Sequence, residues 1–202
     1  MSAKYPWLVL ATTNPHKAEE IASILGGLSI PLKTLKDFPP LPTVEETGTT
    51  YEENAELKSR AVAAALNFPA IADDSGIEID AMDGKPGIYS SRFMGEETPY
   101  AEKNRRILET LKDAPGGKRG ARFVCAAALT LPDGETFVVR GEVSGTIPRE
   151  AGGQKGFGYD PIFFLPEFGK TMAEISTEEK NRISHRALAF RKLSKILLEK
   201  LK

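Results

Sequence analysis

Two pairs of neighbouring acidic residues could support carboxylate chemistry. Glu45-Glu46 lies in a Pro-rich segment, and Asp73-Asp74 follows a short apolar run. Neighbouring carboxylates repel one another unless a cation lies between them, and Mg²⁺ binds one or two carboxylates together with water and phosphate oxygens. The acidic pairs therefore predict a divalent-cation site. The alternatives are a plain turn at Asp73-Asp74 and ordinary surface acids at Glu45-Glu46.

The segment Thr12-Thr13-Asn14-Pro15-His16-Lys17 is typical of an anion-binding helix start. Asn14 and Pro15 favour the N-cap and first turn of a helix. A helix N-terminus offers unpaired N–H groups and the positive end of the helix dipole. Lys17 is disfavoured in this first turn unless an anion such as phosphate binds there. A simple Asn cap with a solvated lysine is the alternative.

Further cationic residues lie on predicted helices. Lys58 shares a helix face with Asn54, four residues before it, and could point at the same phosphates. Lys180, His185 and Arg186 fall in the first turns of the last predicted helix, where the helix dipole gives cations no stabilisation. His185 and Arg186 could donate hydrogen bonds to carbonyl groups of a base. Solvated or locally satisfied side chains are the alternative.

The segment Gly156-Phe157-Gly158-Tyr159-Asp160-Pro161 combines glycines with aromatic rings. A purine could stack on Phe157 or Tyr159, an interaction worth roughly 1–3 kcal/mol per base. Asp160 could accept hydrogen bonds from a base or from the backbone. A packed turn leading into the apolar run 162–165 explains the segment equally well.

Composition excludes several classes of function. The 202 residues favour one domain, 1–202, and 27 Lys+Arg against 28 Asp+Glu give a net charge of -1, which argues against a DNA-coating protein. Cys125 is the only cysteine, so internal disulfides and multi-cysteine metal sites are excluded, and it is expected in the core. No apolar run of roughly 18 residues occurs, so we expect no membrane span and a cytoplasmic location.

The elements that must position these residues alternate between strands and helices. The apolar run 7–11 predicts a buried first strand, and Thr50 with Glu53 forms a capping box that opens a helix to about residue 66. Short strands are expected at 70–72 and around Ile77 and Ile79, and the first of them ends at Asp73-Asp74-Ser75-Gly76. A turn at 131–135 predicts a long β-hairpin. Together with helices opening at Thr98-Pro99 and after Ser176, the last running to Leu201, these elements predict an α/β fold with a mixed sheet.

Taken together, these segments resemble the inosine triphosphate pyrophosphatase family, which acts on non-canonical purine nucleoside triphosphates. The matching motifs follow one another in order from about residue 7 to 195. They are Thr-x-Asn-x-x-Lys at 12–17, Glu-Glu-Thr-Gly at 45–48, Tyr-Glu-Glu-Asn-Ala-Glu-Leu-Lys at 51–58, Ala-Asp-Asp-Ser-Gly at 72–76, Gly-Lys-Pro-Gly-Ile-Tyr-Ser-Ser-Arg at 84–92, Gly-Phe-Gly-Tyr-Asp-Pro-Ile-Phe at 156–163 and Glu-Lys-Asn-Arg-Ile-Ser-His-Arg at 179–186. Each motif alone is weak, whereas seven in one order are specific.

The resemblance implies a fold, an activity and a set of functional residues. The fold would be an elongated α/β body with a mixed central sheet flanked by helices, with two lobes around a substrate cleft, and would form a homodimer. The activity would be Mg²⁺-dependent hydrolysis of ITP, dITP and XTP to the monophosphate and pyrophosphate. Asp74 would be the catalytic base and a metal ligand, and Glu45 would share the metal. Substrate would be bound by Thr12, Thr13, Asn14, Pro15, His16, Lys17, Lys58, Ser75, Phe157, Gly158, Tyr159, Asp160, Lys180, His185 and Arg186.

Two other functions compete with this interpretation. A Maf-like nucleotide pyrophosphatase would favour pyrimidine or modified nucleotides, but the segments 157–160 and 180–186 argue against it. A binding module for nucleotides or single-stranded nucleic acid could use the aromatic segment and the basic last helix. Such a module has no need of the two acidic pairs, so we expect a nucleotide substrate and no stable nucleic-acid partner.

Overall fold

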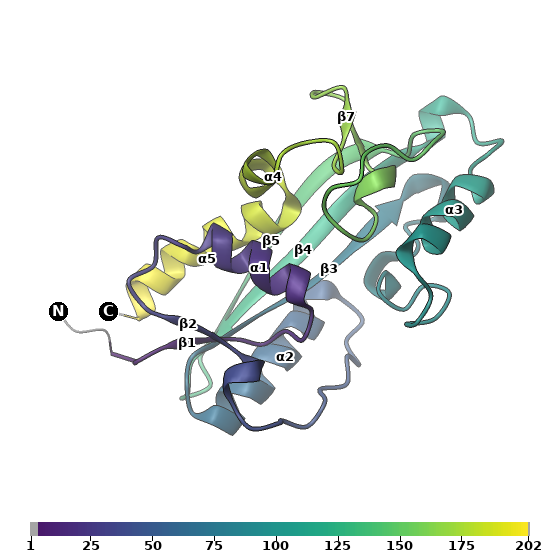
Figure 1. The fold of residues 1–202 in the computed structure, drawn as a ribbon. Helices are drawn as coiled ribbons and strands as arrows, with labels where there is room; N and C mark the ends of the chain where they lie inside the picture. Colours follow the sequence, from purple (N-terminus) through teal and green to yellow (C-terminus); the bar gives the residue numbers. More distant parts are fainter. Residues whose placement is uncertain (1–3, 202) are drawn as a thin grey trace. The chain divides into compact units, whose positions relative to one another are not determined.

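A computed structural model describes residues 4–201. Figure 1 follows the chain through its helices and strands. The helices are α1 (Pro15–Ile24), α2 (Tyr51–Leu66), α3 (Tyr100–Thr110), α4 (Thr177–Ile183) and α5 (His185–Lys200). The strands are β1 (Leu8–Leu10), β2 (Leu32–Thr34), β3 (Ala70–Ile79), β4 (Gly120–Thr130), β5 (Thr136–Thr146), β6 (Phe164–Leu165) and β7 (Lys170–Thr171). No helix among residues 4–201 is long and apolar enough to cross a membrane.

The strands form one mixed sheet, in the order β2-β1-β3-β4-β5-β6-β7. Strand β1 is parallel to both β2 and β3, whereas β6 is antiparallel to β5 and β7. The predicted α/β fold with a mixed sheet is therefore confirmed. The parallel pairs need crossover helices and the antiparallel pairs need only short turns, which is why both kinds of connection occur in the chain.

The chain divides into two compact units, and the boundaries between them fall inside β3, β4 and β5. Unit 1 comprises Met1–Asp74, Cys125–Gly141 and Arg186–Lys202. Unit 2 comprises Ser75–Val124 and Glu142–His185. Each unit has its own hydrophobic core, so we describe the two separately.

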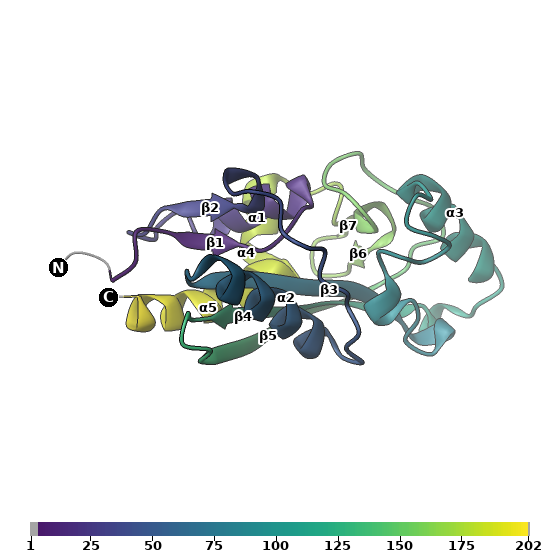
Figure 2. The same cartoon turned by 90° about the horizontal axis from the view of Figure 1, so that it is seen from below.

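In unit 1 the alternation of strand side chains divides the core between two faces of the sheet. Leu8, Leu10 and Ile71 pack with residues of α1 and α5, whereas Val9 and Ala72 pack with residues of α2. Figure 1 shows α1 and α5 on one side of β1 and β3 and α2 on the other, and Figure 2 views the strands from the α2 side. Successive strand residues point to opposite faces, so neighbours in β3 meet different helices.

The β3 strand corrects one prediction. The sequence predicts two short strands, the first of which ends at residues 73–76, but β3 continues without a break from Ala70 to Ile79. The register with β1 covers only Ala70 and Ile71, and β4 is the other neighbour of β3 in the sheet, so strand pairing prevails over the turn preference of Asp, Ser and Gly. Asp73 and Asp74 therefore lie inside a buried strand and not beyond its end.

The last predicted helix is also corrected. Ser176 and Glu179 do form the predicted capping box, but the helix that they open ends at Ile183. Ser184 has an extended backbone, with φ -66° and ψ 155°, and a new helix begins at His185. Hydrophobic spacing continues across this break, so the helical period alone could not reveal it. Helix α2 and the hairpin β4–β5 match their predictions, and Cys125 is fully buried as predicted.

The core of unit 2 surrounds a buried arginine. The Arg119 side chain donates hydrogen bonds to the backbone carbonyls of Ile147, Leu111 and Pro148, and the residue is 5% exposed. These carbonyls belong to segments on either side of β4, so one guanidinium joins parts of the chain that are distant in sequence. A planar group with five N–H donors is needed to satisfy three carbonyls at once.

We expect Arg119→Met to lower the free energy of unfolding by about 2–5 kcal/mol, because it leaves buried carbonyls without donors. Urea unfolding of the purified protein measures this effect. Arg105→Ala is the matched control, since Arg105 is an exposed arginine of α3 that pairs with Glu102 and Glu109 of its own helix. Equal stability losses in the two variants would contradict the assigned role of Arg119.

Candidate functional site

The first predicted site segment forms the N-terminus of α1. The Asn14 side-chain oxygen accepts hydrogen bonds from the backbone N–H groups of His16 and Lys17, at 3.0 and 3.2 Å. Thr12 accepts one from the Asn14 backbone at 3.2 Å. Asn14 is thus a helix cap, as its position predicts, while Thr13 and His16 are exposed.

Lys17 has an anionic partner inside unit 1. Its ammonium lies 3.0 Å from Asp73 Oδ2, and the Asp73 side chain is completely buried. This carboxylate stabilises a cation in the first turn of α1, where we had expected a phosphate to be needed. A bound phosphate remains a prediction, but the position of Lys17 no longer requires one.

Arg186 binds the same carboxylate from α5. Its Nε and one terminal nitrogen lie 3.4 and 3.5 Å from Asp73 Oδ2, and its other terminal nitrogen lies 2.5 Å from Glu20. Burial opposes ionisation of Asp73, but Lys17 and Arg186 together hold its pKa well below the usual range. Burial likewise disfavours the charged guanidinium, but Asp73 and Glu20 raise the pKa of Arg186. In this structure Arg186 therefore forms a buried ion-pair network within unit 1.

Asp74 faces α2, on the opposite side of β3. Its Oδ2 accepts a hydrogen bond from Asn54 at 3.3 Å, and its Oδ1 lies 3.4 Å from the Lys58 ammonium. Lys58 also lies 2.6 Å from Glu46. Burial, with the negative charges of Glu46 and Asp73, outweighs the nearby lysines and raises the pKa of Asp74. A carboxylate with a raised pKa is suited to accept a proton from water.

The surroundings of Lys58 explain why its side chain stays charged although it is largely buried. Burial alone would lower the pKa of this lysine, but the negative charges of Asp74, Asp73 and Glu46 raise it overall. The lysine therefore remains a cation next to two carboxylates. This is the electrostatic arrangement that a phosphate-binding lysine beside a metal site requires.

A divalent cation fits this donor set, although with few protein ligands. Among residues 4–201 no group of three or more His, Cys, Asp or Glu side chains is arranged to hold a metal ion. Asp74 and Glu46 nevertheless both contact the Lys58 ammonium, and Asp73 Oδ1 is buried with no hydrogen-bond partner. Mg²⁺ binds through one or two carboxylates plus water and phosphate oxygens, so the chemistry of this carboxylate pair is compatible with Mg²⁺. Glu45, the predicted second ligand, is exposed, and its neighbour Glu46 occupies the position beside Lys58.

The aromatic segment lies in unit 2, where Asp160 holds it in place. Asp160 Oδ2 accepts hydrogen bonds from the Phe157 backbone at 2.8 Å and from the Lys180 ammonium at 2.6 Å. Lys180 also lies 4.9 Å above the Phe157 ring. A Cβ on Gly156 would lie 2.1 Å from Asp160 Oδ2, and the φ of Gly156 is +72°, so only glycine fits there. The segment is a rigid, ion-paired turn that presents Phe157.

The two aromatic residues of this turn differ in their surroundings. Tyr159 is 4% exposed, donates a hydrogen bond to the Ser90 carbonyl at 2.7 Å and packs edge-on against Tyr100. Burial raises its pKa. Phe157 is only half-buried. Of the two predicted stacking residues, Phe157 is therefore the one with a ring that a base could reach.

His185 and Arg186 are neighbours in sequence but belong to different environments. The His185 ring stacks on Phe123 in unit 2, with centroids 4.6 Å apart and planes at 16°, and Phe123 packs in turn on Phe163. The Arg186 side chain belongs to the ion-pair network of unit 1. The structure therefore does not group them as one pair of base-reading donors. Their predicted contacts with a base stay predictions. The same is true of the phosphate contacts predicted for Thr12 and Thr13 and of the place of Ser75 in the site.

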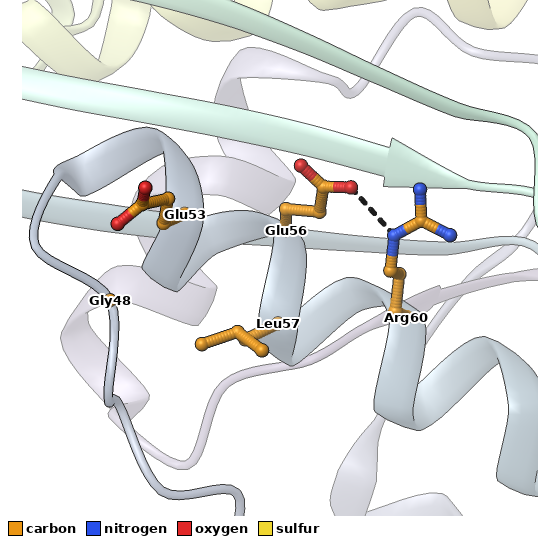
Figure 3. Close-up of a pocket in the computed structure, with 5 residues that line it drawn as sticks. All are labelled: Gly48, Glu53, Glu56, Leu57 and Arg60. Carbon is orange, nitrogen blue, oxygen red and sulfur yellow. Dashed lines mark hydrogen bonds and ion pairs between the residues drawn. The ribbon is translucent and has the colours of Figure 1, made fainter.

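A depression in the surface of unit 1 lies beside α2. Figure 3 shows its lining residues, and Glu56 binds Arg60 there at 2.6 Å. The five lining residues are Gly48, Glu53, Glu56, Leu57 and Arg60. None of the predicted site residues is among them, so this depression is not the candidate site.

Three residues in these networks were not assigned roles from the sequence. Glu46 belongs to the predicted acidic pair, but the resemblance implies Glu45 as the metal ligand. The spacing of Asn54 and Lys58 places both on one helix face, and only the structure shows that Asn54 contacts Asp74. Glu20 had no distinguishing feature, since an acid on an exposed helix face is common.

Comparison with known proteins identifies the family to which this chain belongs. The model of the Ham1 family matches residues 8–196. A dITP/XTP pyrophosphatase of Listeria monocytogenes is 49% identical over 192 residues, which cover 95% of each protein. The structure of a HAM1 protein from Coxiella burnetii has a TM-score of 0.86 and 41% identity, covering 95% of this chain and 98% of that one. The structure of the Staphylococcus aureus Ham1 protein has a TM-score of 0.85 and 42% identity, and the match covers 96% of this chain and 98% of that one. The resemblance found in the sequence is thus confirmed over nearly the whole chain, which belongs to the Ham1 family.

Proposed function

We propose that this protein is a nucleoside-triphosphate pyrophosphatase that hydrolyses ITP, dITP and XTP to the monophosphate and pyrophosphate, with Mg²⁺. Relatives that are 45–49% identical and named dITP/XTP pyrophosphatase support the substrate class. The observation that carries the reaction is Asp74, a buried carboxylate with a raised pKa beside the cationic Lys58. The proposal extends to a homodimer in the cytoplasm, on the strength of the sequence resemblance alone.

The network in unit 1 explains how a triphosphate could be bound and attacked. Lys17 and Lys58 supply positive charge for the phosphate oxygens, and Asp74 orients a water molecule and accepts its proton. The network has one more acidic side chain than basic side chains. Its acidic residues are Asp73, Asp74, Glu46 and Glu20, and its basic residues are Lys17, Lys58 and Arg186. A triphosphate adds further negative charge, which favours a divalent cation held by Asp74 and Glu46. When bound, Mg²⁺ would neutralise charge on the phosphate and leaving-group oxygens.

Base recognition is proposed for two side chains of unit 2. Phe157 offers a ring for stacking, and His185 offers a ring nitrogen toward a 6-oxo group. Adenine has an amino donor at that position and would leave such a donor unpaired, a cost of about 1–3 kcal/mol. This difference supports a preference for ITP and XTP over ATP.

A panel of nucleoside triphosphates tests the proposed reaction. We expect ITP, dITP and XTP to yield pyrophosphate and the monophosphate, with kcat/KM at least about tenfold above that for ATP. Pyrophosphate and orthophosphate are measured separately, so that the cleaved bond is identified. Release of orthophosphate alone, or equal rates with ATP, would contradict the proposal.

Turnover should require a hard divalent cation. EDTA is expected to abolish hydrolysis of ITP, and excess Mg²⁺ is expected to restore it. The reason is that the carboxylates of this site repel a triphosphate unless a divalent cation lies between them. Pyrophosphate release in metal-free and Mg²⁺-containing buffer is the measurement. The idea fails if the metal-free enzyme is fully active.

Asp74→Asn is expected to lower kcat by at least about a hundredfold, since it removes both a base and a carboxylate ligand. Asn keeps the shape of the side chain, and thermal unfolding checks that the variant still folds. Glu46→Gln and Glu45→Gln form a matched pair of controls. The structure predicts a larger loss of activity for Glu46→Gln, and the reverse order would restore Glu45 as the metal-binding residue.

A further inference from the structure

Asn54 makes two hydrogen bonds that link different parts of unit 1. Its side-chain oxygen accepts a hydrogen bond from the Gly48 backbone N–H at 2.9 Å, and its side-chain nitrogen donates to Asp74 Oδ2 at 3.3 Å. The residue is completely buried. One amide thus joins the segment that follows Glu46 to the carboxylate on β3.

The segment at Gly48 lies directly against the start of α2. A Cβ on Gly48 would lie 2.6 Å from Asn54 Oδ1 and 2.7 Å from Glu53 Cβ, so there is no room for a side chain. Glu53 accepts hydrogen bonds from the backbone N–H groups of Thr49 and Thr50, at 2.6 and 3.2 Å. The backbone that carries Glu46 is therefore fixed from α2 only two residues after that carboxylate.

Asn54 and Lys58 hold the two acidic groups in a closed arrangement. Lys58 contacts Glu46 and Asp74 Oδ1, while Asn54 contacts the Gly48 backbone and Asp74 Oδ2. The two residues are one helical turn apart, so both project from the same face of α2. Each oxygen of Asp74 has its own partner, which fixes the rotation of the carboxylate.

We propose that Asn54 is a positioning residue, which orients the Asp74 carboxylate and holds the Glu46 segment beside it. The inference rests on the proposed hydrolysis of nucleoside triphosphates at this site. An amide suits both contacts, because it accepts at its oxygen, donates at its nitrogen and adds no charge. Catalytic groups displaced by about 1 Å can lose on the order of a hundredfold in rate.

Two substitutions of Asn54 separate its two hydrogen bonds. Asn54→Asp keeps an acceptor for the Gly48 N–H but puts a carboxylate oxygen against Asp74, whereas Asn54→Ala removes both bonds. We expect both variants to lower kcat for ITP about tenfold to a hundredfold with KM changed much less, because Asn54 contacts the acidic groups and not the lysine charges. Hydrogen exchange of the Gly48 amide should accelerate in Asn54→Ala and stay slow in Asn54→Asp.

Ser59→Ala is the matched control for the loss of a buried hydrogen bond on the same helix. Ser59 is fully buried and lies 2.8 Å from the Thr130 hydroxyl, away from Asp74. This variant should keep the wild-type kcat and slow exchange at Gly48. Gly48→Ala, with Asn54 intact, should lower kcat as the Asn54 variants do.

Each possible failure has a distinct meaning. Wild-type kcat in both Asn54 variants would overturn the role of Asn54 toward Asp74, and slow Gly48 exchange in Asn54→Ala would overturn its role toward the Glu46 segment. An equal loss of kcat in Ser59→Ala would reduce Asn54 to a purely structural residue. If the wild-type protein hydrolyses no nucleoside triphosphate, the proposed function fails, while exchange at Gly48 still tests the hydrogen bond.

Discussion

The burial of two adjacent carboxylates inside a central strand is the constraint on which unit 1 depends. Successive residues of a strand face opposite sides of the sheet, so Asp73 and Asp74 form their direct ion pairs with different helices. Asp73 turns toward α1 and α5, which supply Lys17 and Arg186. Asp74 turns toward α2, which supplies Lys58. The three helices must therefore pack so that each cation reaches its own side of β3.

The need for counter-ions to the buried Asp73 carboxylate explains why cations lie at the starts of two helices. Lys17 and Arg186 lie in the first turns of α1 and α5, where the helix dipole repels positive charge. A buried carboxylate between them more than offsets that repulsion, and removing one partner of such a network typically costs about 3–5 kcal/mol. The acids and bases of unit 1 are thus mutually dependent. The charged groups to which we assign the proposed reaction also hold the helices on the sheet.

The two faces of β3 are chemically different as a result. On the α1 and α5 face, Asp73 is surrounded by cations and its pKa is lowered, so it is a permanent anion. On the α2 face, burial and neighbouring acids raise the pKa of Asp74, so this carboxylate retains affinity for a proton. Two identical side chains, one residue apart, therefore differ in their electrostatics: Asp73 anchors cations, and the proton affinity of Asp74 suits the role of base that we propose for it.

The sequence by itself determined the local elements and the family. The capping box at Thr50 and Glu53 sets the start of α2, the Pro-Asp-Gly turn at 132–134 closes the hairpin, and ordered motifs identify the family, because each depends on residues close together in the chain. Only the tertiary structure decided that β3 is continuous, since its place in the sheet beside β4 overrides local turn preference. It also decided that Glu46 faces Lys58 and that Arg186 turns to Asp73, because such partners are chosen by packing between distant segments.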